Sequence, residues 1–159
     1  MGGKPTATVL GRGFKTTTPE AGLINGAMSH ALDYDDITVI TKTHPSAVLI
    51  PAALPMAEEV NASGRDMLLA YLLGFEVACS VGENISPAYF DDLGWHPTGP
   101  LGAIGAAAAA ARLLDLDVEQ PHGNLSRRSQ ASGLRQNFGT MTKPFHAGHA
   151  CNLVSQPQN

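Results

Sequence analysis

Residues 98–114 read TGPLGAIGAAAAAARLL, and this stretch decides the fold class. Six consecutive alanines, Ala106 to Ala111, follow Gly102 and Gly105. Alanine has the highest helix propensity of any residue, so the stretch predicts a helix over 98–114. Side chains this small let neighbouring helices approach closely. The stretch therefore indicates a mainly α, multihelical domain with tightly packed helices.

A helix start lies well upstream, at Thr18-Pro19-Glu20. A hydroxyl residue, a proline and an acid in this order are typical of a first helical turn. The pattern predicts a helix over 18–32. Gly22 and Gly26 are four residues apart on it, so they share one face where another backbone can come close.

Two further helices are expected between these segments. The first runs over 46–60, and because Pro51 and Pro55 lie inside it, we expect a kink or two short pieces. The second runs over 63–81 and opens with a capping box at Ser63. It is apolar on nearly every face, which predicts burial on most sides.

The remaining segments carry weaker signals. Residues 1–17 are expected to be an extended lead-in, with a hint of a strand over 6–10. Proline and glycine interrupt a poorly formed fifth helix over 117–133 and predict a loop-like tail over 134–159. No linker divides the chain, so residues 1–159 are interpreted as one domain.

Composition excludes several classes of protein. The 159 residues carry a net charge of −4, with no basic run longer than Arg127-Arg128, so no nucleic-acid partner is expected. No apolar stretch reaches the roughly 20 residues that span a bilayer, so no membrane partner is expected. Cys79 and Cys151 lie far apart, which favours a reduced, cytoplasmic setting.

Three carboxylates follow the first predicted helix, at Asp33, Asp35 and Asp36. Like charges this close raise one another's pKa, which prepares a carboxylate to hold or accept a proton. The alternative is a solvated acidic helix end. Because a helix C-terminus disfavours acids, their position favours a functional role.

Two histidines each precede a predicted helix start. His44 lies in Thr43-His44-Pro45-Ser46, and His96 lies in the loop Gly94–Gly99 beside a tryptophan. A histidine at such a place can bind an anion or transfer a proton. The alternatives are a capping or surface role for His44 and a satisfied core histidine at position 96.

A cationic patch lies near the end of the chain, where Lys143, His146 and His149 fall within seven residues. Such a patch suits a carboxylate or a phosphate, so Lys143 and His146 are candidate substrate-binding residues. The i, i+3 spacing of the two histidines also permits a zinc site completed by an aspartate. No accompanying metal-binding signature supports it, and no metal is expected.

Five blocks together resemble the MmgE/PrpD family in order and spacing, from Ala7 to Ala150. They are NGAMSHALDYDD (25–36), THPSAVLIPAALPMAEE (43–59), SGRDMLLAYLLGFEV (63–77), GWHPTGPLGAIGAAAAAARLL (94–114) and SQASGLRQNFGTMTKPFHAG (129–148). The family includes 2-methylcitrate dehydratases, cis-aconitate decarboxylases and related enzymes. The resemblance implies that Asp33, His44 and His96 are active-site residues and that Lys143 binds a substrate carboxylate. It implies no cofactor.

The resemblance also implies an activity and an organisation. The expected reaction is that of 2-methylcitrate dehydratase in propionate catabolism, the loss of water from a tricarboxylate. Decarboxylation of the cis-aconitate type and epimerisation are the alternatives. Residues 1–159 would be part of the family's helical domain, without its α+β lid domain, and the full-length protein would be a homodimer. A further alternative is an inactive piece that serves only in binding or oligomerisation.

Overall fold

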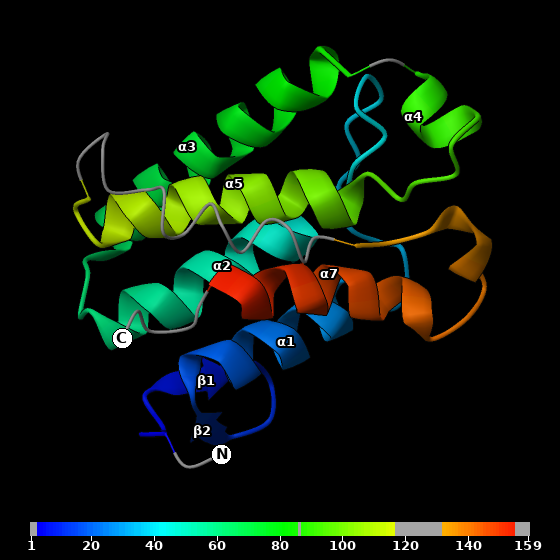
Figure 1. Cartoon of the computed structure of the whole chain (residues 1–159). Coiled ribbons are helices and arrows are strands. Elements are labelled where there is room, and N and C mark those ends of the chain that lie inside the picture. Colours follow the sequence, from blue (N-terminus) through cyan, green and yellow to red (C-terminus); the bar gives the residue numbers. More distant parts are fainter. Residues whose placement is uncertain (1–2, 86, 117–131, 155–159) are drawn as a thin grey trace.

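A computed structural model of the chain describes residues 3–85, 87–116 and 132–154. It shows a bundle of helices with a small β-hairpin at one end (Figure 1). The mainly α fold class is therefore confirmed. In chain order the elements are β1 (Ala7–Val9), β2 (Phe14–Thr16), α1 (Thr18–Ser29), α2 (Ser46–Glu59), α3 (Gly64–Glu83), α4 (Ala88–Asp91), α5 (Thr98–Leu113), the 3-10 helix η2 (Arg135–Asn137) and α7 (Thr142–Val154).

The segment expected to be an extended lead-in forms the hairpin. Strands β1 and β2 pair antiparallel, with Ala7 opposite Thr16 and Val9 opposite Phe14. The strand hint over residues 6–10 is thus confirmed. The side-chain amide of Asn25 on α1 donates to the carbonyl of Thr8 at 2.9 Å, which fastens the hairpin to the bundle.

Helix α7 packs between α1 and α5, and α2 contacts all three of these helices (Figure 1). The predicted close approach at Gly26 is confirmed, because a Cβ added there would lie 2.8 Å from the Cα of Gly148 on α7. Two helices that touch at glycine bring their remaining side chains close together. This contact fixes α7 against α1 and so fixes the residues near both helix ends.

The predicted close packing of the alanine-rich helix is also confirmed. Helix α5 meets α3 at Gly105, where an added Cβ would lie 2.5 Å from the carbonyl oxygen of Gly74. The buried residues of α3 are all small and recur every four positions. They are Ala70, Gly74, Ala78 and Gly82.

The expectation that α3 is buried on most sides is wrong. Its leucines point away from α5, and they are 42–59% exposed. The exposed residues are Leu68, Leu69, Leu72 and Leu73. The physical reason is that, among the described residues, α3 packs through its small-residue stripe and the flanking Met67, Tyr71 and Phe75, which leaves these leucines outside the contact.

Helix α2 is one continuous helix, so the expectation of two short pieces is not met. Pro51 and Pro55 lie inside it and are both buried. Each proline removes one backbone hydrogen bond. Burial of α2 against its neighbouring helices supports the helix at the places where those bonds are missing.

The expectation of a loop-like tail from residue 134 is wrong, because Thr142–Val154 form α7. Pro144 falls in the first turn, where a backbone N–H has no helical partner to lose. Gly148 is the contact point with α1 rather than a break. The short helix α4 lies between α3 and α5, and the fifth helix expected over 117–133 lies almost wholly outside the described residues.

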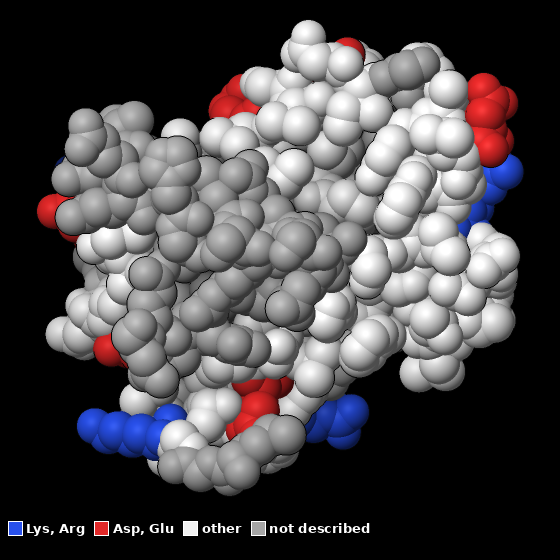
Figure 2. Space-filling model, viewed as in Figure 1, with Lys and Arg blue, Asp and Glu red and all other residues white. Residues whose placement is uncertain are grey.

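Figure 2 shows Lys and Arg at separate places along the edge of the face viewed, with Asp and Glu near some of them. Among the described helices, none has both the length and the apolar composition needed to cross a bilayer.

Candidate functional site

Three segments that are distant in the sequence converge on one group of imidazoles, carboxylates and a lysine. They are the end of α1 with the loop that follows it, the residues just before α5, and the first turns of α7. We call this group the imidazole–carboxylate cluster. Its members are His30, Asp33, Asp35, His44, His96, Lys143 and His146.

Asp35 holds two of the histidines. Nδ1 of His30 donates a 2.8 Å hydrogen bond to Oδ2 of Asp35. Nδ1 of His44 lies 3.2 Å from the same oxygen but out of line for a hydrogen bond. His30 caps the C-terminal end of α1 and is 1% exposed, and its burial lowers its pKa although Asp35 acts in the opposite direction.

Asp33 pairs with Lys143 of α7, whose Nζ contacts Oδ1 of the carboxylate. The hydrogen bond with Lys143 lowers the pKa of Asp33 despite some burial. The expectation that neighbouring acids raise the pKa here is therefore wrong for Asp33. The reason is that the backbone at Asp33 adopts φ 54°, in the left-handed region, and the side chain meets a cation rather than another acid.

The third carboxylate, Asp36, has a structural task. Its Oδ1 accepts from the backbone N–H of Ser46 at 3.1 Å, and its Oδ2 accepts from the hydroxyl of Ser46 at 2.9 Å. An acceptor at this place satisfies a free N–H at the start of α2. The three acids thus do three different things, which their spacing alone does not reveal.

His96 and His146 form a buried pair whose Nδ1 atoms lie 3.1 Å apart. The backbone N–H of His96 donates to the carbonyl of Gly133 at 2.9 Å, which ties the start of α5 to the segment before η2. Burial lowers the pKa of His96 to about 3, and the nearby histidines add to the effect. Burial also lowers the pKa of His146. Both rings are therefore neutral at pH 7, so one donates the shared hydrogen bond and the other accepts it.

The two halves of the cluster meet at His30. Its ring stacks on that of His96, with centroids 5.5 Å apart and planes within 15°. Its ring also lies 4.7 Å from that of His44, edge to face. Phe138 packs edge-on against His96 at 4.8 Å and lies 5.0 Å from Nζ of Lys143. The imidazoles thus form a continuous row beside the lysine.

Several buried polar atoms of the cluster have no hydrogen-bond partner. They are Nε2 of His30, Oδ1 of Asp35, Nδ1 of His44 and Nε2 of His96. Buried polar groups are nearly always hydrogen-bonded, so four such atoms in one group require an explanation. An ordered water or a polar ligand bound in the cluster would supply the missing partners.

The structure brings together all five residues that the sequence singled out as catalytic or substrate-binding. They are Asp33, His44, His96, Lys143 and His146. His149 lies apart, stacked on Phe145 at 5.6 Å. Within the described residues, the group of side chains close enough to share a metal ion does not include His146 or His149.

Sequence reasoning missed His30. The signal was present, because a histidine at the end of the predicted helix precedes Asp33 by three residues and Asp35 by five. A cation-forming side chain suits a helix C-terminus. An aspartate just beyond the helix end is within reach of it.

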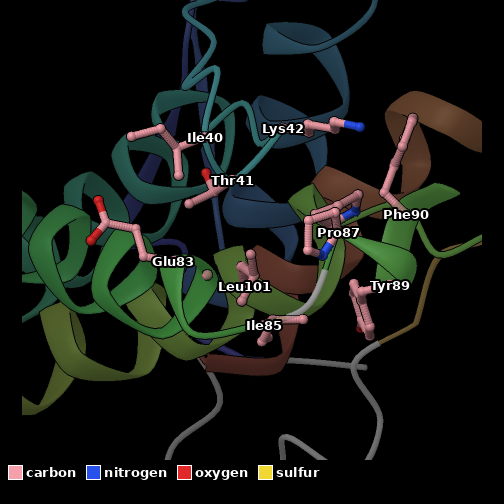
Figure 3. Close-up of a pocket in the computed structure, with 11 residues that line it drawn as sticks. Ile40, Thr41, Lys42, Glu83, Ile85, Pro87, Tyr89, Phe90 and Leu101 are labelled. Atoms are coloured by element: carbon pink, nitrogen blue, oxygen red, sulfur yellow. The ribbon is translucent and has the colours of Figure 1, made fainter.

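A separate pocket of about 170 Å³ lies between the tip of the loop over 38–43, the end of α3 and α4 (Figure 3). Its wall is mostly apolar, and Figure 3 shows Lys42 and Glu83 at its edge. Lys42 already pairs with Asp91 at 2.9 Å. No member of the imidazole–carboxylate cluster is among the residues that line this pocket.

The fold and the cluster define a helical domain with buried neutral imidazoles beside a lysine–carboxylate pair. The chain belongs to the MmgE/PrpD family, since the pattern of the MmgE/PrpD N-terminal domain matches residues 1–154. This confirms the resemblance found in the sequence and places the chain in a family of the lyase type.

Three curated relatives of the chain are each named cis-aconitate decarboxylase. The chain is 33% identical over 151 residues to the cis-aconitate decarboxylase of Mus musculus, covering 91% of this chain and 31% of the relative. It is 34% identical over 135 residues to that of Homo sapiens, covering 82% and 28%. It is 30% identical over 149 residues to that of Aspergillus terreus, covering 89% and 30%. The chain thus spans about a third of the length of these relatives.

Proposed function

We propose that this chain supplies the acid–base groups and the anion-binding lysine of a lyase that acts on an unsaturated tricarboxylate of the cis-aconitate type. The names of the relatives support the reaction class. The observation that carries the proposal is the contact between Lys143 and Asp33 beside the unpartnered nitrogen of His44. It places a cation for a carboxylate next to an imidazole that can transfer a proton.

Substrate binding would use Lys143. Its side chain is 11% exposed, and the carboxylate of Asp33, which is 53% exposed, is its ion-pair partner. A substrate carboxylate that took the place of Asp33 would keep the ammonium paired. The exchange costs little because one carboxylate replaces another, and the remaining negative charges of the substrate would meet the imidazole row.

Decarboxylation requires one bond to break and one proton to be delivered. The bond between a carbon and its carboxylate group breaks, CO2 leaves, and the electron pair spreads over the adjacent double bond and the carboxylate conjugated with it. Lys143 would stabilise this developing negative charge. His44 would deliver the proton to carbon, because its Nδ1 has no hydrogen-bond partner and the carboxylate of Asp35, 3.2 Å away, favours the proton-carrying form of the ring.

A second candidate is loss of water from 2-methylcitrate, the reaction expected from the sequence. It needs a base for a C–H proton and an acid for the leaving hydroxyl. The neutral pair His96–His146 is separated from His44 by His30, so the cluster offers two distinct places for proton transfer. This separation is the observation that keeps dehydration as an alternative.

One experiment tests both reactions. The purified protein is incubated with cis-aconitate or with 2-methylcitrate, and proton NMR follows products together with CO2 release. We expect a five-carbon product and CO2 from cis-aconitate, and loss of turnover in Lys143→Ala but not in Lys15→Ala, which changes a lysine on the hairpin. Turnover of 2-methylcitrate alone would favour the second candidate. A folded protein that converts neither acid would refute the proposed activity for this chain and favour a binding role.

A further inference from the structure

We propose that His30, Asp33, Asp35 and His44 form a binding site for one zinc-type divalent cation, which competes with Lys143 for Asp33. The inference begins from the donors. Two imidazole nitrogens and two carboxylate oxygens lie within 4.8 Å of one another. Imidazole and carboxylate are both common ligands of Zn²⁺, and structural zinc sites hold four ligands in a tetrahedron.

The distances between the donor atoms fit such an ion. Zinc–ligand bonds of about 2.1 Å place tetrahedral ligands roughly 3.4 Å apart. In the structure, Nδ1 of His30 lies 2.8 Å from Asp35 and 3.7 Å from Asp33, and Nδ1 of His44 lies 3.2 Å from Asp35. These three separations lie on both sides of the ideal value, and all four donors lie within 4.8 Å of one another. Two donors at that largest separation would each need to move inward by about 0.7 Å to reach the tetrahedral spacing.

Unpartnered atoms give an independent indication of a ligand. Nδ1 of His44 and Oδ1 of Asp35 have no hydrogen-bond partner, although the side chain of Asp35 is only 9% exposed. An ion between these residues would coordinate the free nitrogen of His44. It would also bind Oδ2 of Asp35, the oxygen that lies close to Nδ1 of both His30 and His44.

The backbone around the donors is held firmly, which lowers the cost of assembling the site. His30 is fixed at the end of α1, where it is 1% exposed. The backbone N–H of His44 donates to the hydroxyl of Thr98 at 3.2 Å. The loop between them closes through the pairing of Thr38 with Thr43. Preformed donors lose little conformational entropy on binding.

Lys143 occupies the place that a cation would take next to Asp33. Lys143 contacts the same oxygen of Asp33, Oδ1, that lies 3.7 Å from Nδ1 of His30, so an ion held by this oxygen would displace the ammonium group from it. The ring of Phe138, 5.0 Å from Nζ, remains as a partner for the released lysine. Binding of the metal needs no catalytic activity. If the proposed function also holds, the metal inhibits it, because the metal binds both His44 and Asp33, the ion-pair partner of Lys143.

The test uses the whole chain, freed of metal and titrated with Zn²⁺ in a calorimeter, with Mg²⁺ as the comparison ion. We expect one Zn²⁺ per chain with a Kd in about the micromolar range or below, and no comparable heat from Mg²⁺. His44→Gln should weaken binding at least about tenfold. His149→Gln is the matched control and should bind as the unchanged protein does.

Lys143→Gln provides the decisive variant, because a structural role for the lysine would not improve metal binding. Removing the competing cation should tighten Zn²⁺ binding at least about threefold. Co²⁺ in place of Zn²⁺ should show the intense visible absorption of a tetrahedral site, and His44→Gln should abolish it. The proposal would be overturned if the protein did not bind one Zn²⁺ per chain. It would also be overturned if His149→Gln lost the binding, or if Lys143→Gln bound Zn²⁺ no more tightly than the unchanged protein. If His44→Gln does not fold, the Lys143→Gln result decides.

Discussion

Nζ of Lys143 contacts Oδ1 of Asp33, although the two residues are 110 positions apart in the chain. The contact joins α7 to the turn that follows α1. It depends on the packing of these helices, which approach each other at Gly26 and Gly148. The site is therefore assembled by the helix contact, and neither residue could form it with its own sequence neighbours.

The first prediction concerns anion binding by Lys143. Lys143→Gln should weaken the binding of cis-aconitate about ten- to a hundredfold, which matches the 1.5–3 kcal/mol of a hydrogen bond to a charged group. A ligand that binds only the folded state raises the melting temperature. The measurement is therefore a circular-dichroism melt with and without millimolar ligand.

Two further variants complete this experiment. Lys15→Gln removes a lysine from the hairpin, where its Nζ donates to the carbonyl of Thr6 at 3.1 Å, and should leave the ligand-induced shift unchanged. Asp33→Asn removes the competing carboxylate and should enlarge the shift. An equal shift in all four proteins would show that Lys143 does not contact the ligand.

Much of the fold could be predicted because its signals are local. Capping residues and helix propensity located α1, α3 and α5 to within a few residues. Helix α7 could not be found in this way, because proline and glycine within it suggest breaks. Only the position of Pro144 in the first turn and of Gly148 against α1 makes them compatible with a helix.

The candidate site was predicted in part for a similar reason. His44 and His96 precede predicted helix starts, and Lys143 lies in a cationic patch, so residue type and local context indicated them. Asp33 and Asp36 differ in their interactions, because Asp33 contacts Lys143 whereas Asp36 accepts a hydrogen bond from Ser46. Both partners lie in other parts of the chain. His30 was missed because its two neighbours become visible only when the loop folds back on the helix end.

The second prediction concerns stability against acid. The pKa of His96 in the folded protein is about 3, well below its ordinary value of 6.5. The unfolded chain therefore takes up this proton first as the pH falls, and stability present above pH 6.5 is lost toward pH 3. The slope is about 1.4 kcal/mol per pH unit for each such histidine. Urea unfolding at a series of pH values measures it.

His96→Gln serves as the test of this assignment. It removes the titrating group, so the free energy of unfolding should depend less steeply on pH by about 1.4 kcal/mol per unit between about pH 6 and pH 4. Asp33 does not interfere, because its pKa is lowered below 3.8 and its contribution is lost only under more acidic conditions. A slope identical to that of the unchanged protein would contradict the burial argument for His96.

The third prediction concerns the contact of α3 with α5. Gly105→Ala should lower the free energy of unfolding by about 1–3 kcal/mol, since the added Cβ would lie 2.5 Å from the carbonyl oxygen of Gly74. Gly64→Ala is the matched control, because nothing lies within 4 Å of a Cβ at the first residue of α3. It should be neutral or stabilise slightly. Chemical denaturation of both variants compares them, and equal losses would argue against backbone contact at Gly105.

The fourth prediction compares two leucines of different surroundings. Leu49 on α2 is fully buried, whereas Leu72 on α3 is 57% exposed. Leu49→Ala should cost about 2–5 kcal/mol of folding free energy through lost burial and the cavity it leaves. Leu72→Ala should cost under about 1 kcal/mol, because most of the side chain already faces solvent. Denaturation is measured at low protein concentration and repeated at a high one. If the loss of folding free energy in Leu72→Ala rises with protein concentration, self-association covers the exposed face of α3. A large loss at every protein concentration would contradict the exposure of Leu72.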